Sequence, residues 1–216
     1  MRPGPLQIVA CPHCQALARY LTLLSGNTLG ARSWTDGKRV APMFPRPPAV
    51  VKCRQCRQCY WLRDAREVGL LERGRPDAEP AWQAARPVAE PTETEYYRAI
   101  RRGLAVDPRQ ERALRIHAWW RRNDAFRGIP GKKPPRLAAG DAWRRNLEAL
   151  AALLDEAAEG DRLMKAEVLR ELGDFASAKL LLSRVPDPRY ASAARQIGEL
   201  CDAADVQVRE LRLADQ

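Results

Sequence analysis

The chain has 216 residues and a net charge of +10, and 45% of its residues are hydrophobic and 30% charged. This composition is typical of one large or two small folded domains and excludes a chain that is disordered throughout. No stretch contains the roughly eighteen uncharged apolar residues of a membrane span, and the first residues lack the apolar core of a signal peptide. We therefore expect a cytoplasmic protein with no membrane partner.

Five of the six cysteines follow Cys-x-x-Cys spacing, in CPHC at 11–14 and CRQCRQC at 53–59. Because no secretion signal precedes them, this spacing favours a metal site over disulfides. Cys11 and Cys53 each follow a short β-branched stretch suited to a strand that delivers the first ligand. When the two cysteine motifs are aligned by these preceding stretches, the alignment predicts four ligands: Cys11, Cys14, Cys53 and Cys56. In the alternative alignment, the second pair is Cys56 and Cys59.

Four thiolates form a soft, tetrahedral donor set that suits zinc and leaves no position open for water or substrate. We therefore expect one structural zinc ion, which stabilises a module too small to bury an adequate core. Cys59 is then expected to be a small apolar side chain on the outgoing strand, and Cys201 a buried one.

Each Cys-x-x-Cys turn, together with the few residues after it, is called a knuckle, the first built on residues 11–14 and the second on residues 53–56. Together the two knuckles resemble the zinc-ribbon family over residues 6–63, and CPHC matches the Cys-Pro-x-Cys knuckle of that family. Arg54 and Arg57 stand where proline and glycine are common in that family. The resemblance implies two knuckles on small antiparallel sheets, which contact nucleic acid or protein. The stretch SGNTLGARSWTDGKRVAPMFPRPP, which joins the knuckles, also resembles a block found in uncharacterised bacterial zinc-ribbon proteins, and this implies a shared fold without a known activity.

That connecting stretch predicts a two-stranded hairpin, LGARSW paired with RVAPMF, because Asp36-Gly37 is a turn signal and later prolines stop its extension. Its tryptophan has two interpretations. Trp34 packs with neighbouring aromatic residues into a small core around the metal, or it lies on a surface that stacks on bases and contacts phosphates. The surface alternative consists of Arg32, Trp34, Lys38 and Arg39.

Residues 64–91 hold four prolines and little apolar periodicity, which predicts a linker that opens with a short helix at 64–73. A capping box at Thr92 and Glu95 begins a helical pattern, and Asp107-Pro108 begins the next helix. We therefore expect an α+β protein: a small β zinc ribbon at 1–63, a proline-rich linker at 64–91 and an all-α helical-hairpin domain at 92–216.

Within the helical part, two helices are predicted to meet at Gly173, with Ala178 allowing their close approach. Leu172, Gly173, Phe175 and Ala178 resemble the turn and small-residue positions of a tetratricopeptide repeat. No second copy follows at the period of about 34 residues. The resemblance therefore implies a tetratricopeptide-like hairpin and not a tandem array.

Positive charge is concentrated at residues 98–145, with 14 Lys and Arg against four Asp and Glu, whereas residues 146–216 carry nine against 14. The basic part could bind an anionic partner or the protein's own acidic end. The candidate nucleic-acid contacts of this segment are Arg112, Arg115, Trp119, Arg122, Lys132 and Lys133. For the arginines and Trp119, the alternative is stacking inside a helix bundle.

The motifs do not indicate an enzyme, because the chain has two histidines, a closed cysteine site and no nucleophile motif or glycine-rich phosphate loop. No small-molecule substrate is indicated either. The favoured hypothesis is a zinc-binding adaptor that uses the ribbon and the helical domain to bind a protein partner. The alternative is a regulatory protein that binds nucleic acid through the ribbon and residues 98–145.

Overall fold

The computed structural model describes residues 1–72, 74, 79–127 and 140–212, which form two compact units. Unit 1 comprises Met1–Ala31 and Val40–Leu104, and unit 2 comprises Arg32–Arg39 and Ala105–Gln216. The strands come first in the chain and most of the helices later, which confirms the expected α+β class. Among the described residues, no helix is both long enough and apolar enough to span a bilayer.

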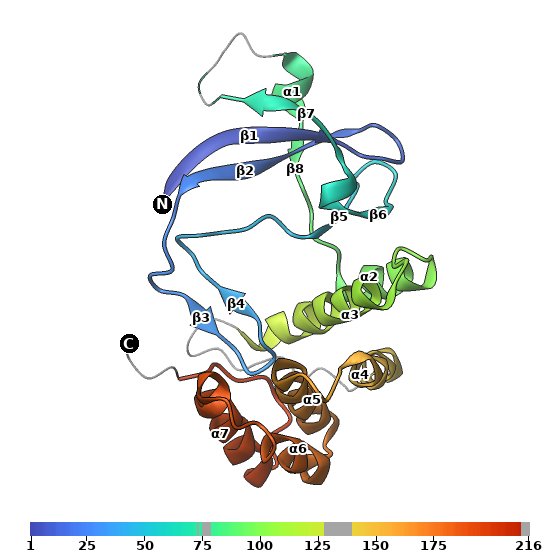
Figure 1. Ribbon diagram of the computed structural model, residues 1–216. Helices are drawn as coiled ribbons and strands as arrows, with labels where there is room; N and C mark the ends of the chain where they lie inside the picture. The colour runs from blue at the N-terminus through green and yellow to red at the C-terminus, as the bar shows by residue number, and fades with distance from the viewer. Residues whose placement is uncertain (73, 75–78, 128–139, 213–216) are drawn as a thin grey trace. The chain divides into compact units, whose positions relative to one another are not determined.

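Unit 1 is built on a four-stranded sheet with the order β7-β1-β2-β8 (Figure 1). Antiparallel pairs join β1 to β2 and to β7, and a short parallel pair joins β2 to β8. These strands span Arg2–Ala10 (β1), Leu17–Ser25 (β2), Arg66–Leu71 (β7) and Arg86–Pro87 (β8). The end of β1 is buried, with Ile8, Val9 and Ala10 at most 2% exposed, because its two faces are both covered.

Two smaller ribbons complete the β structure: β3 (Arg32–Ser33) with β4 (Arg39–Val40), and β5 (Val50–Lys52) with β6 (Cys59–Trp61). The first ribbon confirms the expected hairpin at the Asp36-Gly37 turn, although its strands are shorter than expected. The helical pieces of unit 1 are a 3-10 turn at Leu62–Asp64, α1 (Pro80–Ala84) and α2 (Glu93–Arg101). The expected capping box of Thr92 and Glu95 begins α2.

Residues 64–91 do not form the expected linker, because both edge strands of the main sheet, β7 and β8, come from this segment. The helix expected at 64–73 is wrong, since Arg66–Leu71 is a strand. Trp82 of α1 packs this segment against the sheet. Its ring occupies the space over Gly69, where any Cβ would lie 2.3 Å from the indole. Any larger residue at position 69 would therefore displace the indole, and the tryptophan packs directly on the backbone of β7.

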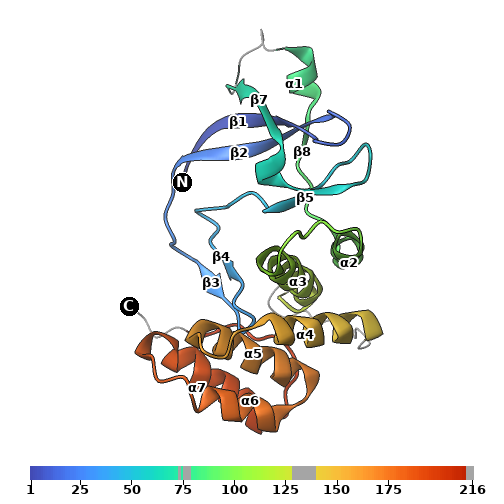
Figure 2. The same cartoon turned by 45° about the vertical axis from the view of Figure 1, so that its right-hand side comes forward.

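Unit 2 is a helical array completed by the hairpin tip at residues 32–39. Its helices are α3 (Pro108–Asn123), α4 (Asp141–Leu153), α5 (Glu159–Leu172), α6 (Phe175–Leu182) and α7 (Pro188–Asp202), with a 3-10 turn at Asp124–Phe126. Neighbours along the chain pack on one another, and α7 also packs on α5 (Figure 2). The main cluster of apolar side chains contains Trp119, Trp143, Leu147, Leu150 and Val168.

The helical hairpin expected at Gly173 is present as α5 and α6. Gly173 has a left-handed backbone with φ of +89°, and the N–H of Asp174 donates to the carbonyl of Leu169 at 2.9 Å, a Schellman ending. Asp174 then caps α6 by accepting from the Ser177 N–H. Ala178 is fully buried, as its small size at a helix crossing predicts.

The two units divide the chain differently from the ranges 1–63, 64–91 and 92–216. Residues 64–104 belong to the compact unit that holds the cysteines, because β7, β8 and α2 pack on its strands. Residues 32–39 belong to the helical unit, although they lie between the two cysteine pairs in the sequence. The chain therefore passes between the units three times.

Candidate metal centre

The first knuckle forms directly after β1, where Cys11 begins a tight turn. The Cys11 N–H donates to the Ala16 carbonyl at 3.0 Å, and the Gln15 N–H donates back to the Cys11 carbonyl at 2.9 Å. Gln15 has a φ of +59°, a left-handed conformation that lets the chain return into β2.

The second knuckle repeats this geometry between β5 and β6. The Cys53 N–H donates to the Gln58 carbonyl at 2.9 Å, and the Arg57 N–H donates to the Cys53 carbonyl at 3.0 Å. Arg57 has a φ of +63° and occupies the position equivalent to Gln15. Both Cys-x-x-Cys sequences therefore fold alike: a strand, two cysteines across a turn, and one left-handed residue before the next strand.

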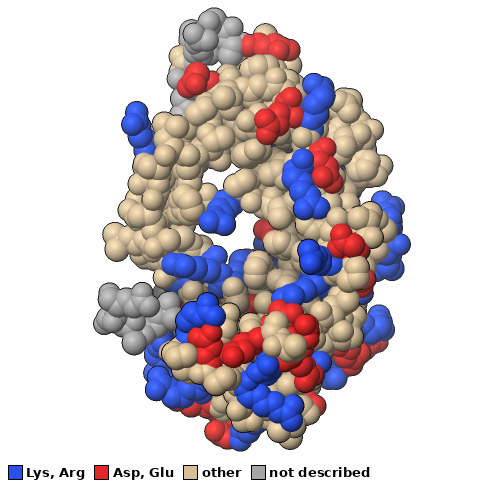
Figure 3. All heavy atoms as spheres, in the orientation of Figure 1, with Lys and Arg blue, Asp and Glu red and all other residues tan. Residues whose placement is uncertain are grey.

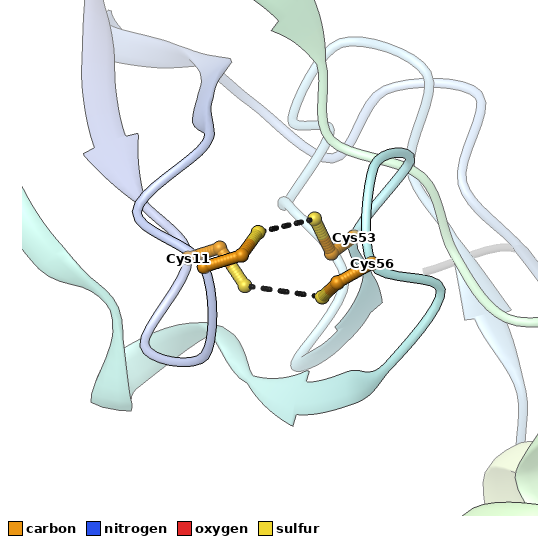
Figure 4. A group of neighbouring side chains, drawn as sticks. Cys11, Cys53 and Cys56 are labelled. Atoms are coloured by element: carbon orange, nitrogen blue, oxygen red, sulfur yellow. Dashed lines mark hydrogen bonds between the residues drawn. The ribbon is translucent and has the colours of Figure 1, made fainter.

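The four predicted ligands form one cluster, with every pair of sulfur atoms within 4.8 Å. Cys11 Sγ lies 3.8 Å from Cys56 Sγ, and Cys14 Sγ lies 3.6 Å from Cys53 Sγ. In Figure 4, Cys11 faces Cys53 and Cys56 across the gap between the knuckles. Zinc–sulfur bonds of about 2.3 Å in a tetrahedron place the sulfurs about 3.8 Å apart, so these distances fit zinc.

Backbone N–H groups and burial shift the pKa values of the cysteine thiols in opposite directions. Burial raises the pKa of Cys11 to about 12, against the N–H groups of His13 and Cys14, which favour its thiolate. The Ala16 N–H donates to Cys14 and lowers the pKa of that thiol to about 7. Burial also raises the pKa of Cys56. Because a metal binds thiolates, uptake must release protons, and the affinity for the metal therefore rises with pH.

Apolar side chains close the centre on the protein side. Val51 and Tyr60 are 1% and 3% exposed and pack with the cysteines, and the exposed ring of His13 lies edge-on to Tyr60 with centroids 6.3 Å apart. Cys59 is outside the four-sulfur cluster and half-buried, and burial raises its pKa. This placement agrees with the alignment that uses Cys53 and Cys56, and with a small packing side chain at position 59.

Replacing Arg57 by glycine is expected to stabilise unit 1 by about 0.5–1 kcal/mol. A left-handed backbone costs a non-glycine residue about 1–2 kcal/mol, and the greater freedom of glycine in the unfolded chain offsets part of this gain. Urea unfolding of the metal-loaded protein measures the change. Arg54→Gly is the matched control, because Arg54 is also an exposed knuckle arginine but has no positive φ, and it should destabilise. A loss of stability in Arg57→Gly would contradict the expectation.

The residues of the 32–39 hairpin that the sequence offered as nucleic-acid contacts lie in unit 2, and most of them contact other residues of that unit. Arg32 forms an ion pair with Glu210, and Lys38 Nζ lies 2.6 Å from Asp124 Oδ1. Trp34 is 5% exposed, so it is neither on an exposed basic surface nor in a core around the cysteines. Arg39, on β4, is exposed.

The candidate contacts on α3 are also engaged within the helical unit. Arg112 pairs with Asp161, Arg115 pairs with Glu111 at 2.6 Å, and Arg122 stacks over the Trp143 ring at 5.1 Å. Trp119 is fully buried. This arrangement matches the helix-bundle alternative for these residues, and the indole is not accessible for stacking on a base. Lys132 and Lys133 lie outside the described residues.

A buried polar network in unit 2 was not expected from the sequence. Asp36, 1% exposed, forms an ion pair with Arg127 and accepts from Asn123 Nδ2 at 3.0 Å. The same amide donates to Glu171 at 2.9 Å, and Trp119 Nε1 donates to that carboxyl group at 2.8 Å. Burial raises the pKa of Asp36, and raises that of Glu171 well above its usual range. A second buried pair, Glu167 with Arg170, lies one helical turn away.

No protein-family model, curated protein or solved structure matches this chain. Its function is therefore inferred from the metal centre and from the chemistry of its described surfaces.

Proposed function

We propose that this protein is a non-enzymatic binding protein, in which a structural zinc ion stabilises unit 1 and the chain uses its exposed surfaces to bind a protein partner. The metal would be held by Cys11, Cys14, Cys53 and Cys56. Four sulfurs complete a tetrahedral shell, so no coordination position is left for water or substrate. This closed donor set supports a structural and not a catalytic role for the ion.

The observation that carries the choice of a protein partner is the exposed apolar surface of the segment between the knuckles. Leu24, Leu29 and Met43 are 63%, 77% and 38% exposed. The Asn27 N–H donates to the Met43 carbonyl at 3.4 Å, so the two arms of this segment lie side by side within unit 1. Leu24 and Leu29 lie three and two residues from Asn27 in the sequence, so all three apolar side chains are close to this backbone contact in the chain, and exposed apolar surface of this kind marks protein–protein contact sites.

Most of the candidate nucleic-acid contacts, in contrast, are satisfied inside the chain. Arg32, Lys38, Arg112 and Arg115 have acidic partners, and Trp34 and Trp119 are buried. These residues therefore offer few free cations and no exposed indole to a nucleic acid. This favours a protein partner over the alternative of a nucleic-acid-binding regulator.

A capture experiment with full-length, nuclease-treated protein tests the proposal. The wild type should retain a partner at moderate salt, because burial of apolar surface is insensitive to ionic strength, whereas Leu29→Asp with Met43→Asp should lose it. Leu180→Asp is the matched control, since Leu180 is a similarly exposed leucine in unit 2. Equal capture by wild type and the double variant would contradict the proposed surface. Oligonucleotide binding that falls steeply with salt would favour the nucleic-acid alternative.

A further inference from the structure

Unit 1 contains a second feature next to the metal centre, a small cleft of about 190 Å³ between the knuckles and α2. One wall comes from the knuckles and includes His13 and Arg57, and the other comes from α2 and the turn after it, with Arg98 and Arg102. Neither the metal centre nor the proposed apolar contact surface uses these arginines. In Figure 3, Lys and Arg side chains, in blue, are spread over the visible face, and some of them lie at the right edge, at the level where Figure 1 draws α2.

The three arginines give this cleft an excess of positive charge. Arg98 and Arg102 are four residues apart and so share one face of the helix. Within the described part of the chain, no carboxylate forms an ion pair with Arg57, Arg98 or Arg102. The acidic residue of the lining, Glu95, is already paired with Lys52. Like charges held together without a counter-ion repel one another, and an anionic ligand would relieve this repulsion.

The size and chemistry of the cleft select the ligand. Its volume lies below the range of about 300–1,000 Å³ typical of sites for drug-sized molecules, so one small group fits better than a whole metabolite. Arginine presents planar forks of N–H donors that match the oxygens of a phosphate. Because Glu95 is paired with Lys52, the three arginines leave a formal charge of three, most of which a phosphate monoester, with a charge of about −1.5 to −2, offsets.

The neighbouring aromatic residues favour a protein as the carrier of the phosphate. The two aromatic side chains of β6, Tyr60 and Trp61, are 3% and 6% exposed. Among the described residues that line the cleft, His13 is therefore the one exposed aromatic ring, and neither Tyr nor Trp offers a base the larger stacking surface that is the usual anchor of single-stranded nucleic acid. We propose that the cleft binds a phosphate group on a serine or threonine side chain of a protein. The cleft stands independently of the proposed function, and only the choice of a protein carrier rests on it.

The test uses full-length, zinc-loaded protein and three probes: inorganic phosphate, peptides of random sequence around a central phosphoserine, and the same peptides with serine. The phosphoserine pool should bind, inorganic phosphate should compete with it, and the serine pool should bind at least tenfold more weakly. Arg98→Gln with Arg102→Gln should weaken phosphoserine binding at least tenfold. Arg101→Gln with Arg109→Gln should not, because both residues are exposed and do not line the cleft.

Equal binding of the phosphoserine and serine pools, or an equal loss in both double variants, would overturn the phosphate site. A single-stranded oligonucleotide that binds more tightly than the phosphoserine pool, and does so through Arg98 and Arg102, would overturn the protein carrier. Loss of phosphoserine binding in Leu29→Asp with Met43→Asp would show that the two surfaces are one. If that variant still binds phosphoserine but no longer captures the partner, the phosphate site and the apolar contact surface are separate, and each proposal can fail without the other.

Discussion

Cys56→Ser is expected to release the metal ion and unfold the sheet of unit 1 in the full-length protein. The substitution removes one of four thiolates from the cluster, and serine is a poor ligand for zinc. The apparent binding free energy of structural zinc is about 10–16 kcal/mol, which is comparable to or larger than the whole stability of a typical domain, about 5–15 kcal/mol. Elemental analysis should show loss of zinc, and limited proteolysis should cut within Met1–Ala31 and Val40–Leu104 while unit 2 stays resistant.

Cys59→Ser is the matched control, because it makes the same chemical change in the same knuckle but outside the four-sulfur cluster. It should keep one zinc ion per chain and cost about 1 kcal/mol or less, since Cys59 is only half-buried. Zinc lost from Cys59→Ser and kept in Cys53→Ser would restore the alternative pairing of Cys56 with Cys59. Full zinc content and unchanged stability in Cys56→Ser would refute a structural role for the cluster.

The features that the sequence predicted correctly depend on residues close together in the chain. The ligand set follows from two Cys-x-x-Cys spacings and the strands that precede them, and the four sulfurs do lie together. Gly173 predicted the turn between α5 and α6 because the left-handed residue that ends a helix is a neighbour in the chain of the backbone groups it serves. The cap of α2 was predictable for the same reason.

The features that the sequence did not predict depend on distant partners. Arg66–Leu71 became a strand because it pairs with β1, and this tertiary pairing overrides a weak local preference for helix. Asp36 was interpreted as a turn residue, which it is, since its side chain accepts from the Lys38 N–H at 3.1 Å. Its second role, as a buried partner of Arg127, joins residues that are 91 positions apart and leaves no local pattern.

The burial of charged residues in the helical unit was also not predicted. Glu167 and Glu171, four residues apart on α5, are 0% and 3% exposed. Charged residues are rarely buried unless they are paired, so a sequence pattern favours the surface interpretation. Arg170 pairs with Glu167 and also donates to the carbonyls of Asp205 and Gln207. Only the path of the chain after α7 supplies those carbonyls, and that path cannot be predicted from helical periodicity.

Asp36→Ala is expected to destabilise unit 2 by about 3 kcal/mol, the lower end of the range for breaking a buried ion pair, because the buried Arg127 guanidinium keeps, among the described residues, only its longer ion pair with Asp124 at 3.3 Å. The Arg127 side chain is 6% exposed, and its Nε already lacks a hydrogen-bond partner. The substitution would also leave Asn123 with Glu171 as its remaining acceptor. Urea unfolding followed by tryptophan fluorescence measures the loss, since Trp34, Trp119 and Trp120 surround this network.

A double-mutant cycle separates the buried charge from the loss of packing. In Asp36→Ala with Arg127→Met, the buried guanidinium that loses its closest partner is gone, so the double variant should be less destabilised than the sum of the two single changes by at least 1 kcal/mol. Asp202→Ala is the control for an exposed pair: its partner is Lys179, both side chains are about half exposed or more, and the cost should stay below about 1 kcal/mol. Additive effects at Asp36 and Arg127, or an Asp36→Ala cost as small as that of Asp202→Ala, would show that the hairpin tip is not held in unit 2 by this ion pair. A large and non-additive cost would instead establish that the turn at Asp36, although it lies between the two cysteine pairs in the sequence, is a structural element of the helical unit. The positions of the cysteines in the sequence would then not define the boundary of the metal-binding unit.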